Sequence, residues 1–262
     1  MIFPALTWVL LLVSLALCVV GFYKFTWFTT VGHGVAVTGL VLGCAVIALS
    51  RGKSSPAFWL SCIFGLLYGL LQGGFTVLAE FLQTRRRQAL KSQRENNTPW
   101  YIYLAFWILT ALVFVLEISP LWYRAASGVG KDSVFSWIAV FFMGAGLVLI
   151  FLSRRQAGIQ RQEDSRIPPM QGVYSLARCP SQLGQILFWT GMLISAFTYV
   201  SGAQWIPVIL GTASALFLAI RSAQRQDKLF RRRYSYLPEY REYAEDTHIL
   251  VPLMMSKPIR WE

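Results

Sequence analysis

Seven runs of apolar residues, most of them close to the length of a bilayer crossing, dominate this sequence of 262 residues. A helix needs about 20 mostly apolar residues to cross the hydrocarbon core. Charged residues make up only 14% of the chain, whereas soluble domains carry about 25%. We therefore expect an all-α integral membrane protein with seven transmembrane helices, near residues 3–23, 32–50, 57–82, 100–122, 134–152, 183–200 and 204–221.

The first apolar run is predicted to be a span and not a cleaved signal. It has no basic segment before it, and it exceeds the usual length of a signal's apolar region. No long linker, repeat or low-complexity stretch divides the chain, so we expect a single transmembrane domain over 1–262. Within it, 1–153 supplies the N-terminal spans and 154–262 alternates polar loops with spans. Such a protein belongs in a bacterial inner membrane, or in the endoplasmic reticulum of a eukaryote.

The net charge of +12 follows the membrane topology and does not indicate a nucleic-acid-binding protein. Basic residues concentrate between spans three and four, between five and six, and after span seven. These segments share one side if the N-terminus is outside and the C-terminus inside, as the positive-inside rule requires. We therefore predict an N-out, C-in topology, with the basic loops facing anionic lipids. The charges on the inner side include Arg85, Arg86, Arg87, Arg154, Arg155, Arg161, Arg231, Arg232 and Arg233.

Neither the cysteines nor the two histidines have a metal-binding spacing. Three cysteines lie inside predicted spans, and Cys179 sits at a membrane boundary, where we assign it no chemistry. His33 and His248 lie far apart, and no partner for His33 is visible in the sequence. Glu117 falls near the outer end of span four, where we expect it to reach the interface. We therefore predict no metal site.

One ionisable residue inside a span indicates a substrate-facing surface. Gln72, Thr76 and Glu80 are four residues apart, so they share one face of span three. Ionisable residues within spans are costly and commonly functional, which makes Glu80 with Gln72 our candidate for the acceptor side of a reaction. The alternative is that Glu80 only pairs with Arg85 or Arg86 at the interface.

The segment 154–185 has the residue types of an anion-binding site. Arginine side chains match phosphates and carboxylates, and Arg178-Cys179-Pro180-Ser181 comes directly before span six. A proline at a helix start leaves free amides and the positive end of the helix dipole at the same place. The residues alone do not distinguish such a site from a basic loop that merely ends at a proline.

Two segments carry a resemblance to known membrane enzymes. GVYSLARCPSQLGQILFWTG, residues 172–191, resembles the G-x-Y-x-x-x-R-H-P segment of isoprenylcysteine carboxyl and phospholipid methyltransferases, and the N-Y-x-G-E segment of steroid 5-alpha-reductases. The tail QDKLFRRRYSYLPEYREYAEDTHILVP is similar to their shared C-terminal ending. Arg166-Ile167-Pro168 resembles a basic turn of the reductases. The chain looks most like the uncharacterised bacterial relatives of the steroid 5-alpha-reductases, over about residues 150–253.

The resemblance implies an NADPH-dependent reductase of a double bond in a lipid-soluble, steroid- or isoprenoid-like substrate. The cytoplasmic loops and the C-terminal tail would then form the cofactor pocket. The residues that would bind the cofactor are Arg161, Arg166, Tyr174, Arg178, Ser181, Gln185, Asp227 and Tyr240.

Departures from the family patterns keep two alternatives open. Cys179 stands where the methyltransferases have histidine, and Ser181 and Gln185 stand where the reductases have asparagine and glutamate. The first alternative is a methyltransferase that uses S-adenosylmethionine in the same pocket. The second is a non-catalytic membrane scaffold or lipid-binding protein with the same fold.

The predicted topology is testable by cysteine-accessibility mapping. Single cysteines within residues 85–94 and near the C-terminus should both be protected from a membrane-impermeant thiol reagent added outside, because the positive-inside rule places both on the inner side. Labelling of one site and not the other would contradict the prediction.

Overall fold

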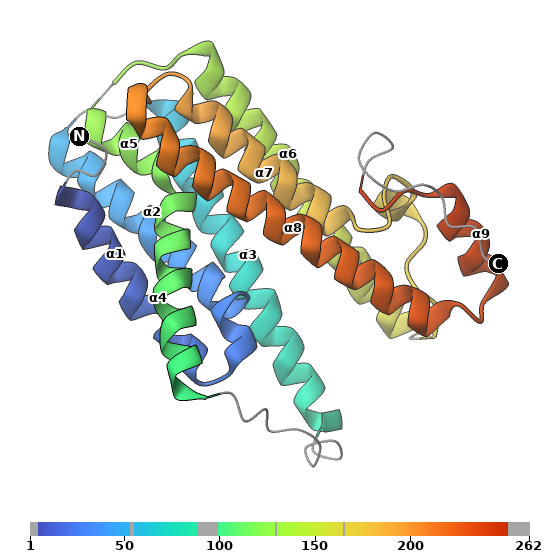
Figure 1. The fold of residues 1–262 in the computed structure, drawn as a ribbon. Helices are drawn as coiled ribbons and strands as arrows, with labels where there is room; N and C mark the ends of the chain where they lie inside the picture. The colour runs from blue at the N-terminus through green and yellow to red at the C-terminus, as the bar shows by residue number, and fades with distance from the viewer. Residues whose placement is uncertain (1–4, 53–54, 88–98, 129, 165, 251–262) are drawn as a thin grey trace. The chain divides into compact units, whose positions relative to one another are not determined.

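The computed structural model describes residues 5–52, 55–87, 99–128, 130–164 and 166–250 (Figure 1). Regular secondary structure in these ranges is helical, with nine α-helices and four short 3-10 helices. The α-helices are α1 (Ala5–Cys18), α2 (Val31–Arg51), α3 (Pro56–Arg87), α4 (Trp100–Glu117), α5 (Ser119–Ser127), α6 (Val134–Glu163), α7 (Pro180–Ala196), α8 (Trp205–Tyr234) and α9 (Pro238–Asp246). The 3-10 helices are η1 (Val19–Phe22), η2 (Phe25–Phe28), η3 (Gly172–Ser175) and η4 (Gly202–Gln204).

The chain is a multi-pass membrane protein, as its composition predicts. Five helical segments in the described residues are long and apolar enough to cross a membrane: Phe25–Arg51, Pro56–Gly74, Trp100–Glu117, Val134–Gln162 and Gly202–Tyr234. The apolar helix Thr7–Phe22 is shorter, and α7 has 17 residues. Seven crossings and the N-out, C-in orientation therefore stay predictions. Most of the basic loop after α3, residues 88–98, lies outside the described residues.

The chain divides into two compact units. Unit 1 comprises residues 1–140 and 192–212, and unit 2 comprises residues 141–191 and 213–262. The helices α6, α7 and α8 therefore each contribute residues to both units. Each unit is described by itself below.

In unit 1, glycines bring the backbones of α2 and α3 into contact. A Cβ added at Gly34 would lie 2.6 Å from the carbonyl oxygen of Gly69, and one added at Gly69 would lie 2.7 Å from that of Gly34. No side chain fits in that space. Helices within a bilayer associate largely through close packing at small residues, so this glycine contact explains the tight pairing of α2 with α3.

The fourth predicted span, 100–122, is two helices. Helix α4 ends at Glu117, Ile118 follows, and α5 begins at Ser119. Pro120 has no N–H to donate to the carbonyl of Leu116, four residues earlier, and this breaks the helical ladder. Gly211 of α8 packs against that carbonyl, where an added Cβ would collide with it. The proline was visible in the sequence, but the packing at the break was not.

A buried ion pair holds one end of unit 1 together. Nη2 of Arg124 on α5 lies 2.6 Å from a carboxylate oxygen of Asp132 and 2.5 Å from the hydroxyl of Ser55. Its guanidinium also lies 4.7 Å from the ring centroid of Tyr199. The other carboxylate oxygen of Asp132 accepts from the backbone N–H of Ala57. Three segments far apart in sequence, around residues 55–57, 124–132 and 199, therefore meet at one arginine.

In unit 2, α6 and α7 cross at glycines. A Cβ at Gly184 would lie 2.6 Å from the carbonyl oxygen of Gly146 and 3.0 Å from the backbone nitrogen of Ile150. Helix α8 runs on to Tyr234, and α9 starts at Pro238. The residues after 221 predict a helix that continues through Arg233 and breaks at Tyr236-Leu237-Pro238, and both expectations are confirmed. The tail then packs through Tyr240 and Ala244 against Tyr234 of α8.

Substituting Gly184 should destabilise unit 2 measurably. We expect Gly184→Ala to cost roughly 1–3 kcal/mol, because the added methyl meets backbone atoms that cannot turn away. Gly158→Ala on α6 is the matched control, since a Cβ there meets nothing within 4 Å. Thermal unfolding of both variants in detergent checks this, and equal midpoints would contradict it.

Candidate functional site

The predicted cofactor-binding residues all belong to unit 2. Most lie where α7 begins and where α8 and the tail come near it. Tyr174 is in η3 and Arg178 precedes α7, whereas Ser181 and Gln185 lie one turn apart on α7. Asp227 is on α8 and Tyr240 is on α9. Arg161 is on α6, and Arg166 is in the segment that follows it.

Arg178 and Asp227 form a buried ion pair at the centre of this cluster. Each side chain is 3% exposed, and Nε of Arg178 lies 3.3 Å from Oδ1 of Asp227, without hydrogen-bond geometry. Nη1 of Arg178 donates to the carbonyl oxygen of Ala244 at 3.2 Å. Two residues that the sequence nominates as cofactor ligands are therefore paired with each other.

A second arginine gives the cluster a net positive charge. Nη2 of Arg231 lies 2.5 Å from Oδ2 of Asp227, one helical turn earlier on α8. The side chain of Arg231 is 36% exposed, so it extends from the buried pair toward the surface. Two guanidinium groups face one carboxylate, which leaves one uncompensated positive charge among these three side chains.

The tail is attached to the start of α7 by backbone hydrogen bonds. The N–H of Arg178 donates to the carbonyl of His248 at 2.9 Å, and the N–H of Cys179 donates to that of Ile249 at 3.0 Å. Apolar side chains continue the contact, with Leu250 of the tail packed beside Cys179 and Ala223. The two residues that precede α7 therefore hold the end of the described chain.

Three tyrosines with little exposure, Tyr174, Tyr240 and Tyr243, lie in this part of unit 2, and two of them donate to backbone carbonyls. The hydroxyl of Tyr174 donates to the carbonyl of Ser153 at 3.1 Å, and that of Tyr243 donates to the carbonyl of Tyr174 at 2.7 Å. Burial raises the pKa of Tyr174 and of Tyr240 to about 12, and the charge of Asp227 adds to the effect at Tyr240. All of these hydroxyls therefore keep their protons at neutral pH.

Cys179 has the environment of a packing residue. Its side chain is fully buried, and its sulfur lies 3.5 Å from the carbonyl oxygen of Ala223. Burial, with a smaller contribution from Asp227, raises the pKa of the Cys179 thiol to about 12. Because the thiolate is the reactive form, this environment disfavours nucleophilic chemistry at Cys179.

Some buried polar atoms of the cluster have no hydrogen-bond partner. Gln182 donates to the side-chain oxygen of Gln226 at 2.8 Å, but its own Oε1 accepts nothing, and Nε of Arg231 donates to nothing. Buried polar groups are normally satisfied. Unsatisfied donors and acceptors beside an uncompensated charge are what a polar ligand uses on binding.

The other nominated residues lie away from the ion pair or outside this unit. The side chains of Arg161 and Arg166 are exposed. Gln72 and Glu80 belong to α3 in unit 1. The carbonyl of Gln72 accepts from the Thr76 hydroxyl at 2.8 Å, and the side chain of Glu80 lies outside the described residues. Whether Gln72 and Glu80 serve an acceptor therefore stays a prediction.

Unit 1 contains an ionisable pair that sequence reasoning missed. Nε2 of His33 lies 2.9 Å from Oε2 of Glu117, and Glu117 is fully buried. The expectation that Glu117 reaches the interface is therefore wrong. The partners are 84 residues apart, so only the packing of α2 against α4 reveals the pair. One signal in the sequence could have indicated that Glu117 has a partner: a carboxylate inside an apolar run is costly unless another group pairs with it.

A family model described as a protein of unknown function, DUF1295, matches residues 36–247. The chain belongs to this family. DUF1295 is part of the membrane superfamily of isoprenylcysteine carboxyl methyltransferases and steroid 5-alpha-reductases, which includes both reductases and methyltransferases. No curated protein and no solved structure matches the chain significantly. The region matched to DUF1295 includes Arg178, Asp227 and Tyr240.

Removing the carboxylate of Asp227 should strongly destabilise the protein. Asp227→Asn leaves the buried guanidinium of Arg178 without a counter-charge, which costs about 3–5 kcal/mol for a buried pair. The exposed Asp246→Asn is the control, because it removes the same charge from the end of α9. The measurement is the unfolding midpoint in detergent, and equal midpoints for the two variants would show that the ion pair contributes no stability.

Proposed function

We propose that the protein is a membrane-embedded, NADPH-dependent reductase of a double bond in a lipid-soluble, steroid- or isoprenoid-like compound. The observation that carries the proposal is the buried Arg178–Asp227 pair together with the half-buried Arg231, which leaves one uncompensated positive charge among the three side chains. Arg178 comes directly before α7, in the segment that resembles the cofactor-binding region of the reductases, and Asp227 and Arg231 are on α8. The superfamily to which DUF1295 belongs includes such enzymes.

The charge of the cluster favours a polyanionic cofactor over a cationic one. NADPH carries a pyrophosphate and a 2′-phosphate, and guanidinium groups bind phosphate in bidentate geometry. S-adenosylmethionine carries a sulfonium cation, which the local positive charge repels. Further basic residues on α8 near the cluster are Arg221, Arg225, Lys228, Arg232 and Arg233.

The residues have separable roles in this proposal. Arg178 and Arg231 would hold phosphate, with Arg161 and Arg166 contributing from the surface, while Asp227 keeps the buried guanidinium of Arg178 and the half-buried one of Arg231 oriented. The neutral hydroxyl of Tyr240, together with Tyr174, Ser181 and Gln185, would bind neutral parts of the cofactor. NADPH supplies the hydride when it is bound, and Gln72 with Glu80 remains our candidate for polarising the acceptor.

A thermal-shift comparison tests the choice of cofactor. A ligand that binds only the folded protein stabilises it by about 2.7 kcal/mol at a hundred times its Kd. We expect NADPH to raise the unfolding midpoint, NADH to raise it less because it lacks the 2′-phosphate, and S-adenosylmethionine to leave it unchanged. A shift with S-adenosylmethionine alone would indicate a methyltransferase. No shift with any of the three would indicate a non-catalytic member of the fold.

Substitution of Arg178 then tests the site. Arg178→Lys keeps the charge but loses the planar fork, so NADPH affinity should fall roughly tenfold to a hundredfold, or about 1.5–3 kcal/mol. Arg155→Lys, at an exposed position of α6 to which we assign no part in binding, is the matched control. Cys179→Ser should change affinity much less, because the thiol is only packed. If Arg178→Lys binds like the wild type while Cys179→Ser does not, the site assignment is wrong.

A further inference from the structure

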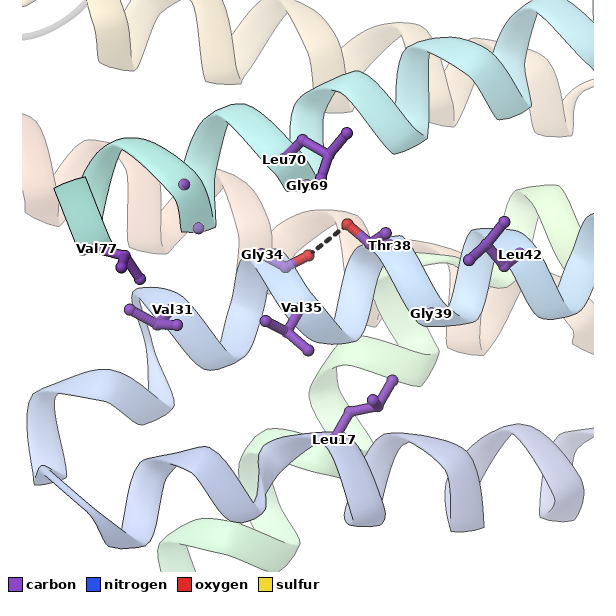
Figure 2. A pocket seen from close by; sticks show the side chains of 12 residues that line it. Leu17, Val31, Gly34, Val35, Thr38, Gly39, Leu42, Gly69, Leu70 and Val77 are labelled. Carbon is purple, nitrogen blue, oxygen red and sulfur yellow. Dashed lines mark hydrogen bonds between the residues drawn. The ribbon is translucent and has the colours of Figure 1, made fainter.

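An apolar groove runs along unit 1 between α1, α2 and α3. It has a volume of about 660 Å³, within the range of roughly 300–1,000 Å³ that is typical of ligand sites. Figure 2 shows Leu17 of α1 below Val35 and Gly39 of α2, with Val31 and Val77 at one end and Leu42 at the other. Leu17, Val31, Gly34, Val35, Thr38, Gly39, Leu42, Gly69, Leu70, Gly73, Gly74 and Val77 line the groove.

Among the described residues that line it, the groove offers no free side-chain hydrogen-bond donor to a ligand. Thr38 is the one polar side chain in its lining, and its hydroxyl already donates to the carbonyl of Gly34 at 2.9 Å, as the dashed line in Figure 2 shows. A polar atom buried without a partner costs at least about 1–3 kcal/mol. The groove therefore suits a ligand segment that carries no oxygen or nitrogen.

The groove is long and glycine-lined. Val31 and Leu42 lie eleven positions apart on α2, so at about 1.5 Å per residue the groove extends about 16 Å. The glycines of α2 and α3 expose backbone in place of side chains, and a Cβ at Gly74 would meet nothing within 4 Å. An extended hydrocarbon chain matches this shape and this lack of polarity. A steroid matches it less well, because its ring system carries oxygen at one or both ends.

The surroundings of the groove determine which hydrocarbon chains can reach it. Helices α2 and α3 both contain segments apolar enough to cross a membrane, and Leu42 and Leu70 at the rim are 49% and 60% exposed. Bilayer phospholipids present acyl chains to such a surface at far higher concentration than any minor lipid does, and occupancy follows concentration. We propose that this groove is a binding site for the acyl chain of a bilayer phospholipid.

The proposal is tested with a phosphatidylcholine that carries a doxyl spin label on one acyl chain. The labelled lipid is added in trace amounts to proteoliposomes, and electron paramagnetic resonance reports the motionally restricted fraction. Gly74→Leu should fill the groove and lower the relative association constant roughly fivefold, which corresponds to about 1 kcal/mol. Gly158→Leu on α6 is the matched control, since its added side chain also starts in open space.

The smaller variant Gly74→Ala keeps the test decisive if Gly74→Leu fails to fold. It adds only a methyl to an open position on a helix, and we expect an intermediate loss of binding, about twofold. Wild-type binding by both Gly74 variants would overturn the proposal. Displacement of the spin-labelled lipid by a steroid ketone or a polyprenol more readily than by unlabelled phosphatidylcholine would also overturn it. No nucleotide is present in these measurements, so their outcome is independent of the reductase proposal.

Discussion

A charged side chain that leaves water must find a counter-charge, and this requirement shapes both units of the protein. The effective penalty for burying one ion is several kcal/mol, and a bilayer supplies no water to reduce it. In the described residues, Arg124–Asp132 of unit 1 and Arg178–Asp227 of unit 2 meet this requirement as ion pairs with little exposure, and the buried Glu117 has the ring of His33 as its hydrogen-bonding partner. Each joins different helices or the segments beside them, so each pair also fixes how its part of the chain packs.

The same requirement limits what Arg178 can do alone. Its guanidinium is held by Asp227 and by the carbonyl of Ala244, so a ligand would meet an arginine that is already oriented. Pre-oriented groups lose less side-chain entropy on binding. The pairing between two nominated ligands therefore agrees with a binding role, provided that the ligand uses the charge that Asp227 does not neutralise.

Much of the fold could be predicted from the sequence because hydropathy and helix breakers are local signals. The spans at α2, α3 and α6 and the break before Pro238 followed from runs of apolar residues and from proline chemistry. The pairing of His33 with Glu117 could not be predicted, since two residues 84 positions apart meet only through the packing of α2 and α4. The break at Ile118 was misread because the apolar run continues through it.

The sequence could indicate which residues gather at the candidate site, but not which of them contact each other. The resemblance brought Arg178, Asp227 and Tyr240 together as a set, but it gave no indication that Asp227 also binds Arg231. That contact decides the charge of the cluster, since a single arginine paired with Asp227 would be neutral. A neutral cluster would attract phosphate only weakly. The additional guanidinium of Arg231 supplies the positive charge that phosphate binding needs.

The C-terminal tail packs directly beside the charged cluster. Backbone bonds from Arg178 and Cys179 to His248 and Ile249 attach the tail beside the ion pair, and the carbonyl of Ala244 accepts from the same guanidinium. A ligand that draws Arg178 toward itself must therefore weaken or rearrange contacts with the tail. If the proposed cofactor binds here, its binding and the docking of the tail would be thermodynamically coupled, and by linkage each would affect the other equally.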